Sequence, residues 1–154
     1  MILISGCNTS SSPLSVIVYD LTTQNIAATL SPGLFGVIWA VAYGADDKEV
    51  AFGGTAGIVY IYSTSNWKSQ QQLHYYGGQG ISCIAFSPIG NFIAAGGDGT
   101  EIDIWNQGTL ISRLSENQSE QGLAFSHDAK FLLSGNWDHK VRMYKANGSW
   151  VSTN

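Results

Sequence analysis

Side chains capable of metal or nucleophilic chemistry are few and scattered in this sequence of 154 residues. Its three histidines, His74, His127 and His139, have no second ligand-type residue at a spacing typical of a metal site. Cys7 and Cys83 lie in apolar surroundings and form no metal or redox motif, so we expect buried free thiols in a reducing compartment. This pattern predicts no bound metal.

The acidic residues and the glycine-rich segments have equally simple structural explanations. Glu101 and Asp103 alternate with two isoleucines, as on an ordinary strand face, and do not indicate a paired-carboxylate site. The glycine-rich segments 53–57 and 96–99 lack the lysine and the following helix of a phosphate-binding loop. We therefore expect tight hairpins at these segments, no catalytic residue and no cofactor.

Composition excludes several further classes of protein. Seven Lys and Arg against eleven Asp and Glu give a net charge of −4, which does not favour nucleic acid as a partner. The chain is 44% hydrophobic and 12% charged, so it is not typical of a disordered protein. No apolar run approaches the ~20 residues of a membrane span, and the apolar start is too short for a signal peptide. We expect no membrane partner and a cytoplasmic or nuclear location.

An internal repeat determines the fold. Four alternating apolar runs end in aromatic residues spaced 43, 43 and 39 residues apart, namely Tyr19, Tyr62, Trp105 and Tyr144. A second marker, a small residue followed by an aromatic residue and a turn residue, keeps this step at 42–44, 85–87 and 124–126. Punctuation within the third unit predicts four short strands, at 81–86, 92–95, 101–105 and 110–114. The chain is therefore expected to be all-β, with antiparallel strands.

Residues 132–144 carry the nearest match to a known family: two leucines, then Ser-Gly-Asn-Trp-Asp-His-Lys-Val-Arg-Met-Tyr, with Asp138 six positions before Tyr144. This stretch resembles the WD-repeat family. The resemblance covers essentially the whole chain, as about 3.75 divergent repeats, and implies β-propeller blades of four antiparallel strands, a (innermost) to d (outermost). It divides the single segment 1–154 into a partial blade 1–33, lacking its innermost strand, and blades 34–76, 77–115 and 116–154.

The family braces each blade with a buried tetrad of Ser or Thr, Asp, Trp and His, and this sequence never completes it. Ser134, Asp138 and Tyr144 come nearest, whereas Glu116 stands where the Gly-His pair before strand a is expected. In the second and third blades, apolar residues or glycine occupy the Ser and Asp positions. We expect apolar packing to replace the polar brace in those two blades, and the repeating residues Val41, Ile84 and Leu123 to lie in the core.

This number of repeats is small for a ring, because a propeller closes on itself with about 4 to 8 blades. Three arrangements remain open. The sequence could belong to a longer propeller, copies of it could associate to complete a ring, or one chain could form a small ring of its own. Of the chain itself we expect an incomplete ring of about four blades.

WD-repeat proteins often bind partners on the top face, through a residue just inside strand a and the residue before the turn Asp. By position these residues are Trp39, Ser82 and Gln121 in strand a, and Thr55, Asp98 and Trp137 in the turns. The resemblance thus implies a non-enzymatic scaffold that presents this face to a protein or peptide. The alternatives are a propeller enzyme or sugar-binding lectin completed by other blades, with Asp98 and Asp138 as its plausible channel acids, and a purely self-associating structural protein.

Overall fold

Four antiparallel sheets make up the computed structural model, which describes residues 2–7, 15–33, 36–78, 80–116, 118–146 and 150–152. Sheet 1 contains β1 (Ile2–Cys7), β2 (Ser15–Asp20) and β3 (Asn25–Leu30), and sheet 2 contains β4 (Ile38–Tyr43), β5 (Glu49–Gly54), β6 (Ile58–Ser63) and β7 (Ser69–His74). Sheet 3 contains β8 (Ile81–Phe86), β9 (Phe92–Gly97), β10 (Glu101–Asn106) and β11 (Thr109–Ser115). Sheet 4 contains β12 (Glu120–Phe125), β13 (Phe131–Asn136), β14 (Val141–Ala146) and β15 (Trp150–Ser152).

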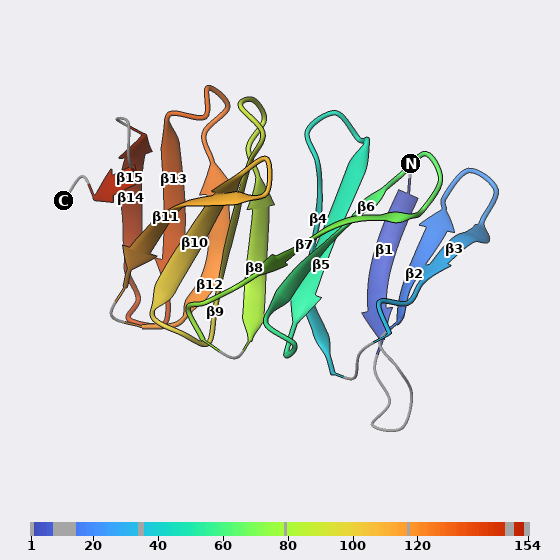
Figure 1. The fold of residues 1–154 in the computed structure, drawn as a ribbon, viewed down its shortest axis with the longest axis horizontal. Coiled ribbons are helices and arrows are strands. Elements are labelled where there is room, and N and C mark those ends of the chain that lie inside the picture. The colour runs from blue at the N-terminus through green and yellow to red at the C-terminus, as the bar shows by residue number, and fades with distance from the viewer. Residues whose placement is uncertain are drawn as a thin grey trace.

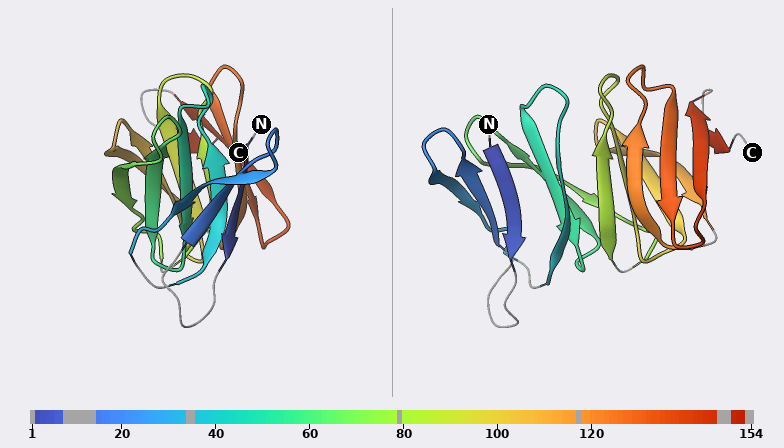
Figure 2. Two further views of the ribbon diagram at one scale, coloured as in Figure 1. Left: turned by 90° about the vertical axis from the view of Figure 1, so that its right-hand side faces the viewer. Right: turned by 180° about the vertical axis from the view of Figure 1, so that it is seen from behind.

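The sheets stand side by side in a row, with sheet 1 and sheet 4 at opposite ends (Figure 1; Figure 2, right). In each sheet, strands that follow one another in the sequence pair with one another. The predicted all-β fold with blades of four antiparallel strands and an incomplete ring is confirmed. The described sheets form an open row, so they are not the small single-chain ring considered above.

Residues with positive φ form two of the turns that the sequence predicted in sheet 3, although β9, β10 and β11 extend one or two residues beyond their predicted bounds. Gln107 and Gly108, between β10 and β11, both have positive φ, at 47° and 84°. Two consecutive residues of this kind make the tight hairpin whose twist matches that of the flanking strands. The a–b turn likewise uses Gly90 and Asn91 at φ 83° and 56°, so both hairpins hold neighbouring strands in register.

Three apolar clusters fill the spaces between neighbouring sheets. Val16, Val18 and Phe52 lie between sheets 1 and 2, whereas Ile104 and Leu132 lie between sheets 3 and 4. The middle strand β6 contributes to two clusters, because successive side chains point to opposite faces and both faces are covered. Its near-continuous apolar sequence is what a strand buried on both sides requires.

Val41 departs from the predicted core and is 43% exposed, whereas its counterpart Ile84 is buried. Val41 lies opposite Phe52 in sheet 2, on the face directed at sheet 1. Sheet 1 as described has β1 as its innermost strand, so no strand a covers Val41 there. Ile84 faces sheet 2, which has its strand a, β4. The same repeat position is therefore core in one sheet and surface in another.

The expectation of purely apolar bracing is wrong for sheet 3. Asp103 is fully buried, so the strand face that it occupies is an interface and not a solvated surface. Its carboxylate accepts hydrogen bonds from Arg113 Nε at 2.8 Å and from the Tyr76 backbone N–H at 2.7 Å. Sheet 2 does use apolar bracing, because Phe52 packs on Tyr60 and Tyr62 with ring centroids 5.5 and 5.3 Å apart.

Sheet 4 has a polar brace centred on Glu116, a residue absent from the family's tetrad. The buried Glu116 carboxylate accepts hydrogen bonds from the hydroxyls of Ser134 and Tyr144 and forms an ion pair with Arg142 Nε at 3.0 Å. Arg142 also pairs with Asp138 at 2.6 Å, which holds the pKa of that carboxyl below its usual range. Ser134, Asp138 and Tyr144 thus meet through Glu116 and Arg142, with a carboxylate in place of the family's histidine.

Candidate functional site

A β-bulge presents each of the three predicted strand-a residues. The pairing register shifts between Ile38 and Ala40, between Ile81 and Cys83, and between Glu120 and Gly122. In each case the residue inside the bulge is the one singled out from the sequence: Trp39, Ser82 and Gln121. A bulge leaves one residue outside the ladder and redirects its side chain, so all three sheets use the same device at the same end of strand a.

The three predicted turn residues are held beside these bulges by equivalent backbone hydrogen bonds. The N–H groups of Thr55, Asp98 and Trp137 donate to the carbonyl of the residue that precedes strand a of the same sheet, at 3.0, 3.1 and 3.3 Å. These carbonyls belong to Val37, Gly80 and Ser119. The structure therefore brings all six predicted residues to one end of sheets 2, 3 and 4, which we call the top face.

Contacts between sheets join these positions into one surface. Ser82 Oγ in sheet 3 donates to the carbonyl of Glu120 in sheet 4, and Ser119 Oγ donates back to the carbonyl of Asp98 at 3.2 Å. A Cβ on Gly80 would stand 2.5 Å from the Trp39 ring and 2.9 Å from the Asp98 carboxylate. Glycine at 80 thus lets the indole of sheet 2 lie against sheet 3 beside an acidic group.

The two tryptophans are the large exposed groups of the six. Trp39 is 47% exposed although one edge packs on Gly80, and Trp137 is 64% exposed. Thr55 differs from them, because its Oγ1 accepts a hydrogen bond from the Val37 N–H at 2.9 Å and supports its own sheet. The surface therefore offers a partner two aromatic groups, with Asp98 and Gln121 exposed as polar groups.

A buried acid lies next to this surface. Glu120 is fully buried against Gly96, and its Oε1 has no hydrogen-bond partner. Its Oε2 accepts a hydrogen bond from the Gly97 N–H at 3.2 Å. Burial raises the pKa of Glu120 to about 8, and Glu116 adds to the shift. Glu120 is therefore predominantly protonated at neutral pH.

Sequence reasoning missed an aromatic residue at the outer rim of the top face. Tyr76 lies two residues after the end of β7 and is largely exposed, and the Arg113 guanidinium lies over its ring at 5.0 Å from the centroid. Arg113 is in turn paired with Asp103 and Glu101. An aromatic residue between the end of strand d and a Gly-Gly pair is a signal that could have identified Tyr76.

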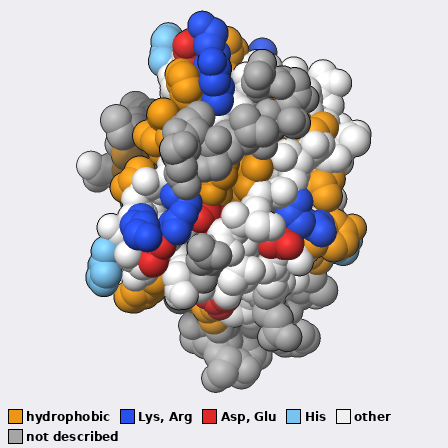
Figure 3. All heavy atoms as spheres, turned by 90° about the vertical axis from the view of Figure 1, so that its left-hand side faces the viewer, with side chains coloured by type: hydrophobic (Ala, Val, Ile, Leu, Met, Phe, Trp, Pro, Cys, Tyr) orange, Lys and Arg blue, Asp and Glu red, His pale blue; other side chains and the backbone are white. Residues whose placement is uncertain are grey.

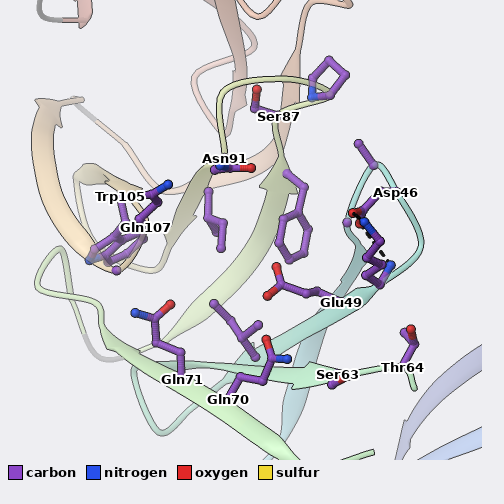
Figure 4. Close-up of a pocket in the computed structure, with 18 of the residues that line it drawn as sticks. Asp46, Glu49, Ser63, Thr64, Gln70, Gln71, Ser87, Asn91, Trp105 and Gln107 are labelled. Atoms are coloured by element: carbon purple, nitrogen blue, oxygen red, sulfur yellow. Dashed lines mark hydrogen bonds and ion pairs between the residues drawn. The ribbon is translucent and has the colours of Figure 1, made fainter. Parts of the chain in front are cut away.

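A groove of about 650 Å³ lies between sheets 2 and 3 at the opposite end of the strands. Apolar side chains line its floor, among them Phe86 and Trp105, and Figure 4 shows Glu49, Gln70 and Gln71 directed toward its centre. Burial and the nearby Asp46 raise the pKa of Glu49. The groove contains none of the six top-face residues, so it is a separate concavity.

The described residues offer little for catalysis. None of them form a group of three or more His, Cys, Asp or Glu side chains that could hold a metal ion, and no helix among them is long and apolar enough to cross a membrane. Burial raises the pKa of the Cys83 thiol to about 12, which leaves it as an unreactive thiol. Of the two plausible channel acids, Asp138 is already held by Arg142, whereas Asp98 stands beside Trp39.

A family model described as "WD domain, G-beta repeat" matches residues 68–106 and 108–145. Each match begins at the outermost strand of one sheet and ends at the third strand of the next. One sequence repeat therefore links two neighbouring sheets covalently.

Similarity to individual proteins extends over most of the chain. The chain is 27% identical to human "Pre-mRNA-processing factor 19" over 143 residues, which are 92% of this chain and 28% of that protein. It is 39% identical over 68 residues to "Periodic tryptophan protein 2 homolog" of Neurospora crassa, covering 42% of this chain and 8% of that protein. A chain in "Crystal Structure of Mitotic Checkpoint Complex" superposes with a TM-score of 0.85 at 18% identity, over 99% of this chain and 48% of that one. The chain thus spans less than a third of the curated relatives and about half of the solved one.

Proposed function

The chain belongs to the WD domain, G-beta repeat family, and we propose that it is a non-enzymatic scaffold whose top face binds a protein or peptide partner. One observation carries this proposal. Two half-exposed tryptophans, Trp39 and Trp137, stand on a surface in which hydrogen bonds join sheets 3 and 4 and the Trp39 ring packs against Gly80 beside sheet 3. Binding would gain from this preorganisation, because few groups lose freedom when the partner docks.

The residue types of the top face support a protein partner. Tryptophan is enriched among the residues that dominate the binding energy of protein interfaces, and truncating such a residue costs at least about 2 kcal/mol. The polar groups around the two indoles, Asp98 and Gln121, fit the polar rim of such an interface. A net charge of −4 favours partners other than nucleic acid.

Retention of proteins from a lysate on the immobilised chain tests the proposal when variants are compared. The Trp39→Ala/Trp137→Ala double variant should lose specific partners while its far-UV circular dichroism and melting temperature stay close to wild type. Ile89→Ala is the matched control, because Ile89 is as exposed as the tryptophans but lies on the opposite side, at the groove. Unchanged retention by the double variant, or its unfolding, would contradict the top-face assignment.

The second candidate is a propeller enzyme or sugar-binding lectin completed by other blades, and Asp98 beside Trp39 is the observation that favours it. An aromatic ring next to a carboxylate can hold a sugar face and one hydroxyl group. Glycan-array binding that is lost in Asp98→Asn would support this candidate over a protein scaffold. For either function we propose a cytoplasmic or nuclear location, consistent with the buried free thiol of Cys83.

A further inference from the structure

The groove between sheets 2 and 3 lies at the opposite end of the strands from the top face, and we propose that it binds a short extended peptide of another protein, through a lysine or arginine flanked by apolar residues. Its volume of about 650 Å³ lies within the range of about 300 to 1,000 Å³ that is usual for ligand sites. All residues that line it lie between positions 44 and 108, in two complete four-stranded sheets. The inference goes beyond the proposed top-face function.

The groove contains one departure from the repeat. Glu49 is the first residue of strand b in sheet 2, whereas Phe92 and Phe131 occupy this position in sheets 3 and 4. Phe92 packs against the apolar cluster between sheets 3 and 4. Glu49 lies at the equivalent point between sheets 2 and 3, because it shares a face of β5 with Ala51, which belongs to the cluster between those sheets. An acidic side chain therefore stands where the next interface has an aromatic ring.

The charge of Glu49 has no partner of opposite sign among the described residues. Acidic side chains elsewhere lie next to basic ones, as Figure 3 shows at the sheet 4 end of the row, and at the groove rim Asp46 pairs with Lys48 at 2.8 Å. Burial and Asp46 both disfavour a negative charge on Glu49, as its raised pKa indicates. A cationic group placed against Glu49 would offset both effects, so the groove is complementary to a basic side chain.

The floor of the groove favours apolar contacts beside this charge. Ile61, Phe86 and Trp105 line it, and all three belong to or pack against the apolar cluster between sheets 2 and 3. The methylene stem of a lysine or arginine can lie on such a surface while its charged head reaches a carboxylate. In an extended peptide, side chains two positions apart point to the same side. We therefore expect an apolar residue two positions before or after the basic one.

Two glutamines of β7 provide groups that match a peptide backbone. The pairing with β6 passes from Gln71 to Ser69, so Gln70 lies inside a β-bulge, which redirects its side chain. Gln70 and Gln71 both line the groove, as Figure 4 shows. Each amide carries donors and an acceptor, as a peptide bond does. The amides favour a peptide over a small amine, which could satisfy Glu49 alone, and the Glu49 carboxylate would repel the phosphates of a nucleic acid.

Selection from a phage library of random peptides tests the proposal. The library is selected on the immobilised chain and depleted on Glu49→Phe, which places the aromatic residue of sheets 3 and 4 in the groove. We expect the peptides that only the wild type retains to share a lysine or arginine with an apolar residue two positions away. Glu49→Phe should keep the wild-type circular dichroism spectrum, because Phe92 occupies the same point in sheet 3. A selection that enriches no peptide on the wild type over Glu49→Phe, or only peptides without a basic residue, would overturn the proposal.

A double-mutant cycle tests the contact with Glu49 itself and uses Glu49→Gln, which keeps the size of the side chain. Fluorescence anisotropy measures the dissociation constants of one selected peptide and of a copy with norleucine in place of its basic residue. Glu49→Gln should weaken binding of the selected peptide about tenfold and leave binding of the norleucine peptide unchanged. Asp128→Asn is the matched control, because it removes the same charge from an exposed turn of sheet 4, and it should bind both peptides as the wild type does. Equal losses for the two peptides in Glu49→Gln would refute the pairing.

Competition with N-acetyl-arginine amide distinguishes a peptide from a small amine. The peptide should remain bound at concentrations of the amide far above the dissociation constant of the peptide, because the amide lacks the backbone and the apolar neighbours. Displacement near that dissociation constant would show that the groove takes a small cation and would overturn the peptide assignment. The groove contains none of the six top-face residues, so peptide binding there and partner binding at the top face can fail independently.

Discussion

Glu120 should make the chain less stable as the pH rises, and Glu120→Gln should remove this dependence. The carboxyl is fully buried, with one weak hydrogen bond at 3.2 Å and an unpartnered Oε1. Its pKa is about 8 in the folded chain against an ordinary 4.5. Between these values the folded state binds more protons than the unfolded state, so the free energy of unfolding falls with increasing pH.

The size of the effect follows from the pKa difference. One pKa unit corresponds to about 1.4 kcal/mol, so the wild type should lose about 3 kcal/mol between pH 4 and pH 7 and up to about 5 kcal/mol by pH 9. Glutamine keeps the shape and the acceptor for the Gly97 N–H but cannot ionise. The variant should therefore gain stability relative to wild type throughout this pH range, whatever its absolute stability.

Urea unfolding followed by tryptophan fluorescence, at half-unit steps from pH 4 to pH 9, measures the two curves. Asp128→Asn is the control, because that exposed carboxyl has a pKa lowered to about 2 by its bonds to Ser126 and Lys130. The stabilising effect of the Asp128 carboxylate is lost only below about pH 4, so the curve of the Asp128→Asn variant should run parallel to the wild-type curve. Parallel curves for Glu120→Gln would refute the assignment of a buried, protonated acid.

Two further predictions concern stability. Glu116→Gln should destabilise the chain by about 1 to 3 kcal/mol in urea unfolding, because it removes the negative charge that pairs with the largely buried Arg142 at 3.0 Å and leaves Asp138 as the remaining carboxylate partner of Arg142. A cost near that of an exposed substitution would show that the Glu116 brace is not needed. Val59→Ala should lower the free energy of unfolding by about 2 to 3 kcal/mol, because Val59 is fully buried. Val41→Ala should lower it by less than about 1 kcal/mol, because the Val41 side chain is exposed. Equal losses would contradict the interpretation that Val41 lacks a covering strand a.

The sequence predicted the strands and the top face because both depend on local pattern. The apolar run and the turn residues after it located Ile81–Phe86 to the residue, and the Gln107-Gly108 pair marked a hairpin that the structure contains. The same step assigned Trp39, Ser82 and Gln121 to one position, although no pattern in the sequence indicates that this position is a bulge.

Polar partners could not be predicted, because they lie 10 to 28 residues apart in the sequence and meet only when the strands fold together. Asp103 alternates with isoleucines like a surface residue, and only the packed sheets show that Arg113 and the Tyr76 N–H reach it. Glu116 occupies the place of a histidine and was noted only as a departure from the family. Once Ser134, Tyr144 and Arg142 surround it, the departure is a substitution of one hydrogen-bonding centre by another.

The exposure of a repeated residue therefore depends on its place in the row more than on its type. Val59 and Val141 are the same amino acid at the same point of strand c, yet one is completely buried and the other lies largely in water. A periodic sequence encodes the interface identically in every unit, and only the presence of a neighbouring sheet turns that interface into core. Sheet 4 consequently retains, at Leu133 and Val141, the apolar chemistry that is interior in the other sheets.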